Sequence, residues 1–169
     1  MKQTFSWAEK TSQTAFPIAR AGYPFIGTAA LTTGTLALLG IVPLALLGLA
    51  ATLFICAFFR DPDRAIPNGE GVLVSPADGK VVAIDTLSET PHFEGQCRRI
   101  GIFMNIFNVH VNRTPHEGEL TDLAYQPGRF MPADRAKAAT DNEHNALTVR
   151  TESGRKICFV QIAGLVARR

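Results

Sequence analysis

The pattern of apolar and charged positions separates a strongly apolar segment from the rest of the chain. No charged residue occurs among the 39 residues between Arg20 and Arg60. One straight helix of that length would measure ~58 Å, whereas the hydrocarbon core of a bilayer is ~30 Å thick. Pro43 interrupts the run near its middle. The pattern therefore predicts two short helices, roughly Tyr23–Leu39 and Pro43–Phe59, joined by a tight turn.

This apolar segment predicts three regions and an attachment to a membrane. The regions are an N-terminal polar segment over residues 1–20, a hydrophobic membrane hairpin over residues 21–59 and a β-rich domain over residues 60–169. Each helix is near the lower length limit for crossing a bilayer, so a shallow re-entrant hairpin is an alternative to a spanning one. Basic residues flank the hairpin on both sides. This arrangement favours the cytoplasmic face of the cell (inner) membrane for both ends.

After residue 60, short β-type runs alternate with turn signals. The runs are Gly71–Ser75, Lys80–Thr86, Arg98–Met104, Glu119–Tyr125, Ala146–Thr151 and Lys156–Ala163. Their spacing predicts a mainly β fold, a small antiparallel sandwich or barrel behind the helical hairpin. Ala133–Asn142 is the one segment of this part with helix-forming composition, and it could equally be a loop.

The charge balance limits the class of partner. The chain carries a formal charge of +2, but from residue 60 onward 14 basic residues face 14 acidic ones. A neutral domain without a basic stripe is not typical of a nucleic-acid-binding protein, so no nucleic-acid partner is expected. The sequence leaves a homo-oligomer open.

The densest group of hydrogen-bonding and titratable side chains follows a predicted strand, in FMNIFNVHVNRTPHEG at residues 103–118. If that strand continues, Asn108, His110 and Asn112 share one of its faces. Such a polar face is either solvated or lines a site. Composition alone does not choose between these alternatives.

No metal site is predicted. His110 and His116 are six residues apart across a proline, which is not the usual spacing of metal ligands. His92 and His144 lie in polar loops and add no pattern.

Asp78 allows a structural and a functional interpretation. In SPADGKVVAID, Asp78-Gly79 stands between two apolar runs, which is the strongest short signal for a hairpin turn. The structural interpretation is therefore the default from local sequence. The functional one is a carboxylate that orients a histidine.

Five motifs are similar to the short bacterial and archaeal form of phosphatidylserine decarboxylase, in the same order and behind a similar apolar hairpin. They are FFRDPDRAIP, VLVSPADGKVV, FMNIFNVHVNRTPHEGEL, KAATDNEHNALTV and KICFVQIAGLVARR. The resemblance runs from the hairpin to the last residue. It implies a membrane-bound carboxy-lyase of phospholipid biosynthesis that converts phosphatidylserine to phosphatidylethanolamine and CO2.

The resemblance also implies a covalent cofactor and a partner chain. Family members are proenzymes that cleave themselves at a Gly-Ser pair, and the serine becomes a pyruvoyl group on a small C-terminal chain. That group accepts the electrons released with CO2. The present sequence has no Gly-Ser pair, and its serines are Ser6, Ser12, Ser75, Ser88 and Ser153. We therefore expect a proenzyme truncated before the pyruvoyl-forming serine, without a cofactor-binding residue of its own and inactive alone.

The resemblance assigns roles to two residues. Asp78 matches the aspartate implicated in self-cleavage, and His110 matches the histidine implicated in protonating the carbanion left by CO2. Longer family members carry a further histidine where this chain has Arg113. Whether His110 or His116 serves self-cleavage therefore stays open. Further candidates for lining the site are Asn108, Asn112, Arg113, His116, Asn142 and Glu143.

Two other classes of function compete with the decarboxylase. One is a non-catalytic membrane-anchored β-domain or inactive remnant. The other is a zinc hydrolase, which the histidine spacing disfavours. A Gly-Ser pair encoded beyond Arg169 would favour the decarboxylase, and a true stop would favour the remnant.

Overall fold

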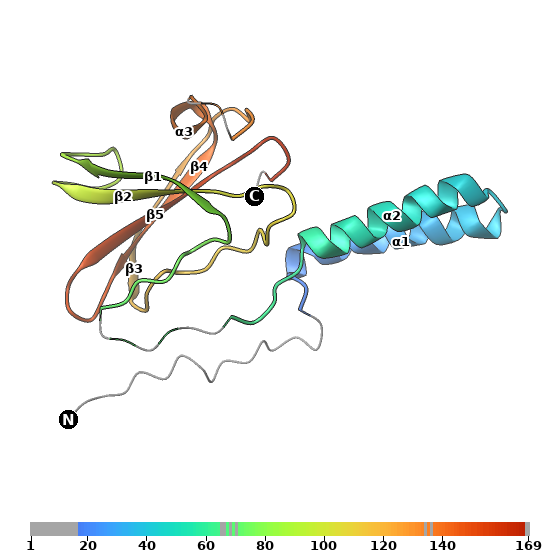
Figure 1. Cartoon of the computed structure of the whole chain (residues 1–169), viewed down its shortest axis with the longest axis horizontal. Helices are drawn as coiled ribbons and strands as arrows, with labels where there is room; N and C mark the ends of the chain where they lie inside the picture. Colours follow the sequence, from blue (N-terminus) through green and yellow to red (C-terminus); the bar gives the residue numbers. More distant parts are fainter. Residues whose placement is uncertain are drawn as a thin grey trace. The chain divides into compact units, whose positions relative to one another are not determined.

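A computed structural model describes residues 17–64, 67, 69, 71–133, 135 and 137–167 of the chain (Figure 1). Most of the predicted polar segment at residues 1–20 lies outside these residues. The chain divides into two compact units. The first contains the described residues up to Gly69 together with Phe107–Val111, and the second contains the other described residues.

A helical hairpin forms the main part of the first unit (Figure 1). The short 3-10 helix η2 (Arg20–Gly22) leads into α1 (Tyr23–Leu38), and α2 (Val42–Phe58) runs back beside it. Each α-helix has a proline in its first turn, where the missing N–H costs no helical hydrogen bond. Gly40 adopts φ 72° in the turn, a conformation that glycine reaches without strain. The predicted break into two helices is confirmed.

The two helices pack closely where small side chains meet. A Cβ added at Gly48 would lie only 2.7 Å from Thr33 Oγ1. The hydroxyls of Thr33 and Thr52 are 3.2 Å apart across the helix interface. No residue of either helix is buried, and Leu38 near the tip is 91% exposed. Among the described residues, no helix combines the length and the apolar character needed to cross a membrane.

At the foot of the hairpin, the end where α1 begins and α2 ends, the residues before α1 form hydrogen bonds with the residues after α2. Ala19 N–H donates to the Phe59 carbonyl at 2.8 Å, and Asp61 N–H donates to the Pro17 carbonyl at 2.6 Å. Gly22 packs so tightly against Phe59 that a Cβ there would meet the ring at 2.6 Å. These contacts fix where α2 ends and the following segment begins.

The second unit contains two antiparallel sheets. In the first, β1 (Lys80–Leu87) pairs with β2 (Cys97–Phe103). In the second, β4 (His144–Arg150) lies between β3 (Glu119–Gln126) and β5 (Lys156–Ile162). The short helix α3 (Ala138–Asp141) precedes β4. The mainly β, antiparallel fold class is confirmed.

Five of the six predicted β-type runs are strands, and Gly71–Ser75 is not. In that segment Val74 N–H donates to the Pro115 carbonyl at 3.0 Å, outside any regular ladder. In Ala133–Asn142, for which a helix and a loop were both open, α3 is the helical part of the described residues. The central strand β4 holds most of the buried strand positions, whereas β3 is exposed along its length.

Candidate functional site

His110 belongs to the first unit, where it lies against the end of α2. Its imidazole stacks on the ring of Phe58, with centroids 4.1 Å apart and planes inclined by 21°. Its Nδ1 is 3.0 Å from the Asn108 carbonyl oxygen. The ring is half-buried in this position.

The segment that carries His110 is tied to the hairpin at Phe107. One N–H group of Arg60 donates to the Phe107 carbonyl at 2.7 Å, and another donates to the Ala57 carbonyl at 2.6 Å. The Phe107 ring meets Phe54 edge-on at 6.3 Å. These contacts hold the segment by its backbone and by an aromatic side chain.

The predicted strand through Asn108, His110 and Asn112 is wrong. β2 ends at Phe103, and residues 104–117 contain no strand. The reason is that side chains take the backbone acceptors a ladder would use, since Arg60 binds the carbonyl of residue 107 and His110 that of Asn108. The three polar residues therefore do not share a strand face.

The surroundings of His110 set its tautomer and lower its pKa. A carbonyl oxygen only accepts, so the bond to Asn108 places the proton on Nδ1 and leaves Nε2 with the lone pair. Burial lowers the pKa of His110 most, the Asn108 bond raises it, and the Arg60 charge lowers it again. The lowered pKa favours the neutral ring at pH 7, with Nε2 ready to accept a proton.

Asp78 lies in the second unit, in an irregular segment that leads into β1. Arg113 N–H donates to the Pro76 carbonyl at 2.9 Å, so the segment containing Asp78 runs beside the one that follows His110 in the sequence. Among the described residues, glycines with positive φ are found at positions 40, 71, 95 and 154, and Gly79 is not one of them. The hairpin-turn interpretation of Asp78-Gly79 is therefore wrong.

The remaining candidates after His110 are held mainly by local bonds. The Nδ1 of His116 is 2.6 Å from the Glu117 carbonyl oxygen, and the Thr114 hydroxyl donates to the His116 carbonyl at 2.7 Å. Asn112 Oδ1 is buried and has no hydrogen-bond partner in the described part of the chain. Asn112 thus offers an acceptor inside the protein for a donor that these residues do not supply.

Asn142 is the most enclosed of the predicted site residues, with 1% of its surface exposed. Its Oδ1 accepts from Met131 N–H at 3.0 Å, and its Nδ2 donates to the carbonyls of Met131 at 2.8 Å and Ala163 at 2.7 Å. Glu143 is also buried, and its backbone bonds to Arg129 and Ala163. The Asn142 side chain therefore joins β4 to the end of β5 and to the loop before α3.

Sequence reasoning missed a pair of histidines beside Asn142. The rings of His92 and His144 meet edge-to-face at 5.0 Å. His144 is 6% exposed, with Nδ1 2.9 Å from the Asn142 carbonyl oxygen and a buried Nε2 that lacks a partner among the described residues. Burial and the neighbouring His144 lower the pKa of His92. The two histidines are 52 positions apart, and no local pattern could have paired them.

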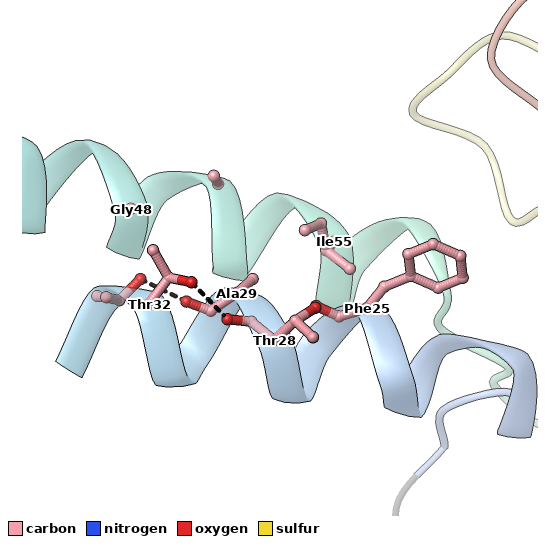
Figure 2. Close-up of a pocket in the computed structure, with 8 residues that line it drawn as sticks. Phe25, Thr28, Ala29, Thr32, Gly48 and Ile55 are labelled. Carbon is pink, nitrogen blue, oxygen red and sulfur yellow. Dashed lines mark hydrogen bonds between the residues drawn. The ribbon is translucent and has the colours of Figure 1, made fainter. Parts of the chain in front are cut away.

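The helical hairpin also contains a groove, which none of the sequence-predicted site residues lines. An open groove of about 330 Å³ lies between α1 and α2, and Figure 2 shows Phe25, Thr28, Thr32 and Ile55 along it. The Thr28 and Thr32 hydroxyls donate to carbonyls of their own helix, which satisfies them. No cluster of metal-binding side chains occurs in the part of the chain that the structure describes.

Comparison with known proteins identifies the family. Residues 51–169 match the family model described as phosphatidylserine decarboxylase. A phosphatidylserine decarboxylase proenzyme of Syntrophus aciditrophicus is 51% identical over 157 residues, covering 90% of this chain and 72% of the relative. One from Desulfotalea psychrophila is 46% identical, covering 93% of this chain and 73% of the relative. The chain therefore belongs to the phosphatidylserine decarboxylase family, which is a family of carboxy-lyases.

Proposed function

We propose that this protein decarboxylates phosphatidylserine to phosphatidylethanolamine in phospholipid biosynthesis. The observation that carries the proposal is the position of His110. Its imidazole has a fixed tautomer, is half-buried on Phe58 and lies at the foot of an apolar hairpin. This places a group that can transfer protons where an apolar lipid could reach it, and the relatives are named for that substrate.

The reaction needs one proton transfer that His110 can perform. When the bond between Cα and the carboxylate breaks, CO2 leaves and the electron pair stays behind at the substrate. Cα must then take up a proton, so each turnover consumes one proton from solvent. His110 accepts that proton at Nε2 and delivers it to Cα. Its lowered pKa makes the protonated ring a stronger acid for this step.

We propose a pyruvoyl group, formed by self-cleavage with Asp78 taking part, as the cofactor. The 169 residues contain no Gly-Ser pair. The buried Asn112 Oδ1 is consistent with such a group nearby. It can accept a hydrogen bond that the described residues do not provide. When bound, a pyruvoyl carbonyl accepts the electron pair released with CO2. The chain's own part is to bind the lipid and to move the proton at His110 Nε2.

We propose that a small chain released from the proenzyme is a partner of the second unit. The support is the apolar surface of the strands, where Val82 is 62% exposed and Leu123 is 56% exposed. The relatives are named proenzymes, which fits a second chain made by cleavage. Covering such side chains stabilises a complex by about 25 cal/mol for each Å² removed from water.

We also propose that the hairpin inserts shallowly into the cytoplasmic face of the cell membrane. The support is the absence of charge between Arg20 and Arg60 and the exposure of apolar side chains along both helices. Soluble proteins rarely expose contiguous apolar patches of this kind, except at sites of protein or membrane binding. Basic residues on both sides of the hairpin favour the cytoplasmic side.

The test is decarboxylation by a longer fusion protein. The sequence is continued with the C-terminal residues of the Syntrophus aciditrophicus relative, and release of labelled CO2 from phosphatidylserine in mixed micelles is measured. The fusion should cleave itself and turn over. His110→Ala should lower turnover by roughly 100- to 10,000-fold, as expected for loss of an acid-base group.

The control is a Ser88→Ala variant, since Ser88 is exposed in the loop that follows β1. It should cleave and turn over like the parent fusion. A His110→Ala protein that is fully cleaved and retains parental turnover would exclude His110 from the mechanism. A cleaved parent that releases no CO2 would contradict the proposed substrate.

A further inference from the structure

Arg60 is the first charged residue after the apolar hairpin, and it lies in the same unit as His110. Its guanidinium donates to the carbonyls of Ala57 and Phe107. Both acceptors are neutral, so neither bond cancels the positive charge. A guanidinium has more N–H donors than these two bonds use, and the remaining donors can bind a ligand.

The side chains around Arg60 suit the part of a lipid where the headgroup meets the acyl chains. Phe54, Phe58 and Phe107 form one aromatic cluster, with Phe54 contacting both of the other rings at 6.3–6.4 Å. His110 stacks on Phe58 within the same cluster. A cation, an apolar surface and an imidazole are thus grouped at the foot of the hairpin.

We propose that Arg60 binds the phosphodiester of phosphatidylserine and thereby sets the headgroup beside His110. This inference rests on the proposed function and specifies its substrate contact. Arginine suits this role because its planar guanidinium can donate two parallel hydrogen bonds to phosphate oxygens. The apolar cluster of Phe54, Phe58 and Phe107 then takes the glycerol end of the acyl chains.

The phosphodiester is a better ligand for Arg60 than the serine carboxylate. The carboxylate loses its negative charge as CO2 forms, so a cation on it would stabilise the substrate more than the transition state. The phosphodiester keeps its charge throughout the reaction. An arginine on the phosphate therefore holds the lipid without raising the barrier.

A purely structural role for Arg60 makes a different prediction. Its bond to Ala57 satisfies a carbonyl at the C-terminus of α2, where basic side chains are favourable. If this were its whole role, replacing Arg60 would change the stability of the hairpin and not the selection of lipids.

The experiment measures binding of short-chain lipids to the 169-residue chain by titration calorimetry. The probes are monomeric dihexanoyl-phosphatidylserine, dihexanoyl-phosphatidylethanolamine, uncharged dihexanoylglycerol and inorganic phosphate. Arg60→Gln should weaken binding of both phospholipids by about 10- to 100-fold and leave dihexanoylglycerol unchanged. Arg60→Lys keeps the charge but cannot donate two parallel hydrogen bonds. It should therefore weaken binding of both phospholipids less than Arg60→Gln does.

Arg150→Gln is the matched control, because Arg150 is an exposed arginine that pairs with Glu119 at 2.6 Å in the second unit. It should bind all probes like the wild type. Circular dichroism of each variant reports whether the hairpin is intact. If Arg60→Gln loses helix, the phospholipid affinity of Arg60→Lys decides between the two roles. A purely structural role predicts that Arg60→Lys binds both phospholipids as tightly as the wild type does.

The other outcomes separate the two proposals. Unchanged phospholipid affinity in a folded Arg60→Gln protein overturns the inference and leaves the proposed function standing. Weakening of phosphatidylserine alone would mean that Arg60 holds the carboxylate, and it also overturns the inference. Inorganic phosphate that binds as tightly as the lipids would indicate a free-anion site instead. A wild-type chain that binds neither phospholipid overturns the inference, and turnover of phosphatidylserine by the cleaved fusion then decides the proposed substrate separately.

Discussion

The chemistry proposed for His110 depends on its contact with Phe58. The Phe58 ring covers one face of the imidazole and excludes water from it, and burial is the largest cause of the lowered pKa of His110. Phe58→Ala opens that face to solvent, so the pKa of His110 should rise toward the usual value of about 6.5. NMR titration of the ring protons measures the change. The pKa of His92 is an internal control that should not move, and an unchanged pKa of His110 would contradict the argument.

The contact between His92 and His144 predicts a pH dependence of stability. Because the pKa of His92 is lower in the folded protein than in the unfolded chain, the unfolded chain binds more protons between these two pKa values. Stability should therefore fall as the pH drops below about 6.5. The two ladder partners of His144, Gln126 and Ile162, are uncharged.

The measurement is urea unfolding of the wild type and of His92→Gln at pH 7.5 and pH 5.5. The wild type should lose more of its free energy of unfolding on acidification than the variant does. His110 also has a lowered pKa, but it is present in both proteins and cancels in the comparison. Equal losses in the two proteins would show that the histidine pair does not couple to folding.

Residues that act through distant contacts are hard to predict from the sequence. His110 was found because it stands in a motif, and the structure adds a tautomer and a stacking partner. Arg60 was counted only as a flanking charge, because its bond to Phe107 spans 47 positions. Asn142 was proposed to line the site, and the structure shows its amide bonded to three backbone groups.

Strands and helices were predictable where local pattern and pairing agree. The five confirmed strands each pair with at least one neighbouring strand, and the apolar hairpin breaks just before Pro43 as expected. Gly71–Ser75 has the composition of a strand but borders residues 113–115 irregularly. Alternation of side chains indicates an extended chain, and it does not reveal which backbone groups will be paired.

A glycine directly precedes the first strand of each sheet. Gly79 precedes β1, and Gly118 precedes β3. A Cβ at Gly118 would collide with the Arg150 carbonyl oxygen and come within 2.7 Å of Val149 Cγ1. Gly118→Ala should therefore separate β3 from β4 at this end and destabilise the fold by about 1–3 kcal/mol. Chemical unfolding followed by circular dichroism measures the loss.

Gly27→Ala provides a control for this prediction. Gly27 lies within α1, and a Cβ there would have no neighbour within 4 Å among the described residues. Alanine favours a helix by about 0.5–1 kcal/mol over glycine, so this variant should not destabilise the protein. If both variants kept wild-type stability, the close approach at Gly118 would not be needed for the sheet.

At the scale of the whole molecule, the distribution of charge and apolar surface supports the proposed attachment to a membrane through the hairpin. The part of the sequence from residue 60 onward is neutral, so an electrostatic attachment has little to act through. The exposed leucines of α1 and α2, by contrast, gain free energy in any apolar environment. Attachment should therefore depend on the hairpin side chains and resist high salt, which shortens the Debye length to about 3 Å at 1 M.

Two substitutions in the hairpin test the proposed attachment without removing the hairpin. Leu38 and Leu47 are exposed, so aspartate at both positions breaks no packing within the chain. Each buried aspartate opposes insertion by up to about 3 kcal/mol, so the double variant should move to the supernatant when vesicles are sedimented in high salt. Leu123→Asp, on exposed β3, should stay with the vesicles. Full recovery of the Leu38→Asp, Leu47→Asp protein with the vesicles would mean that another surface binds the membrane.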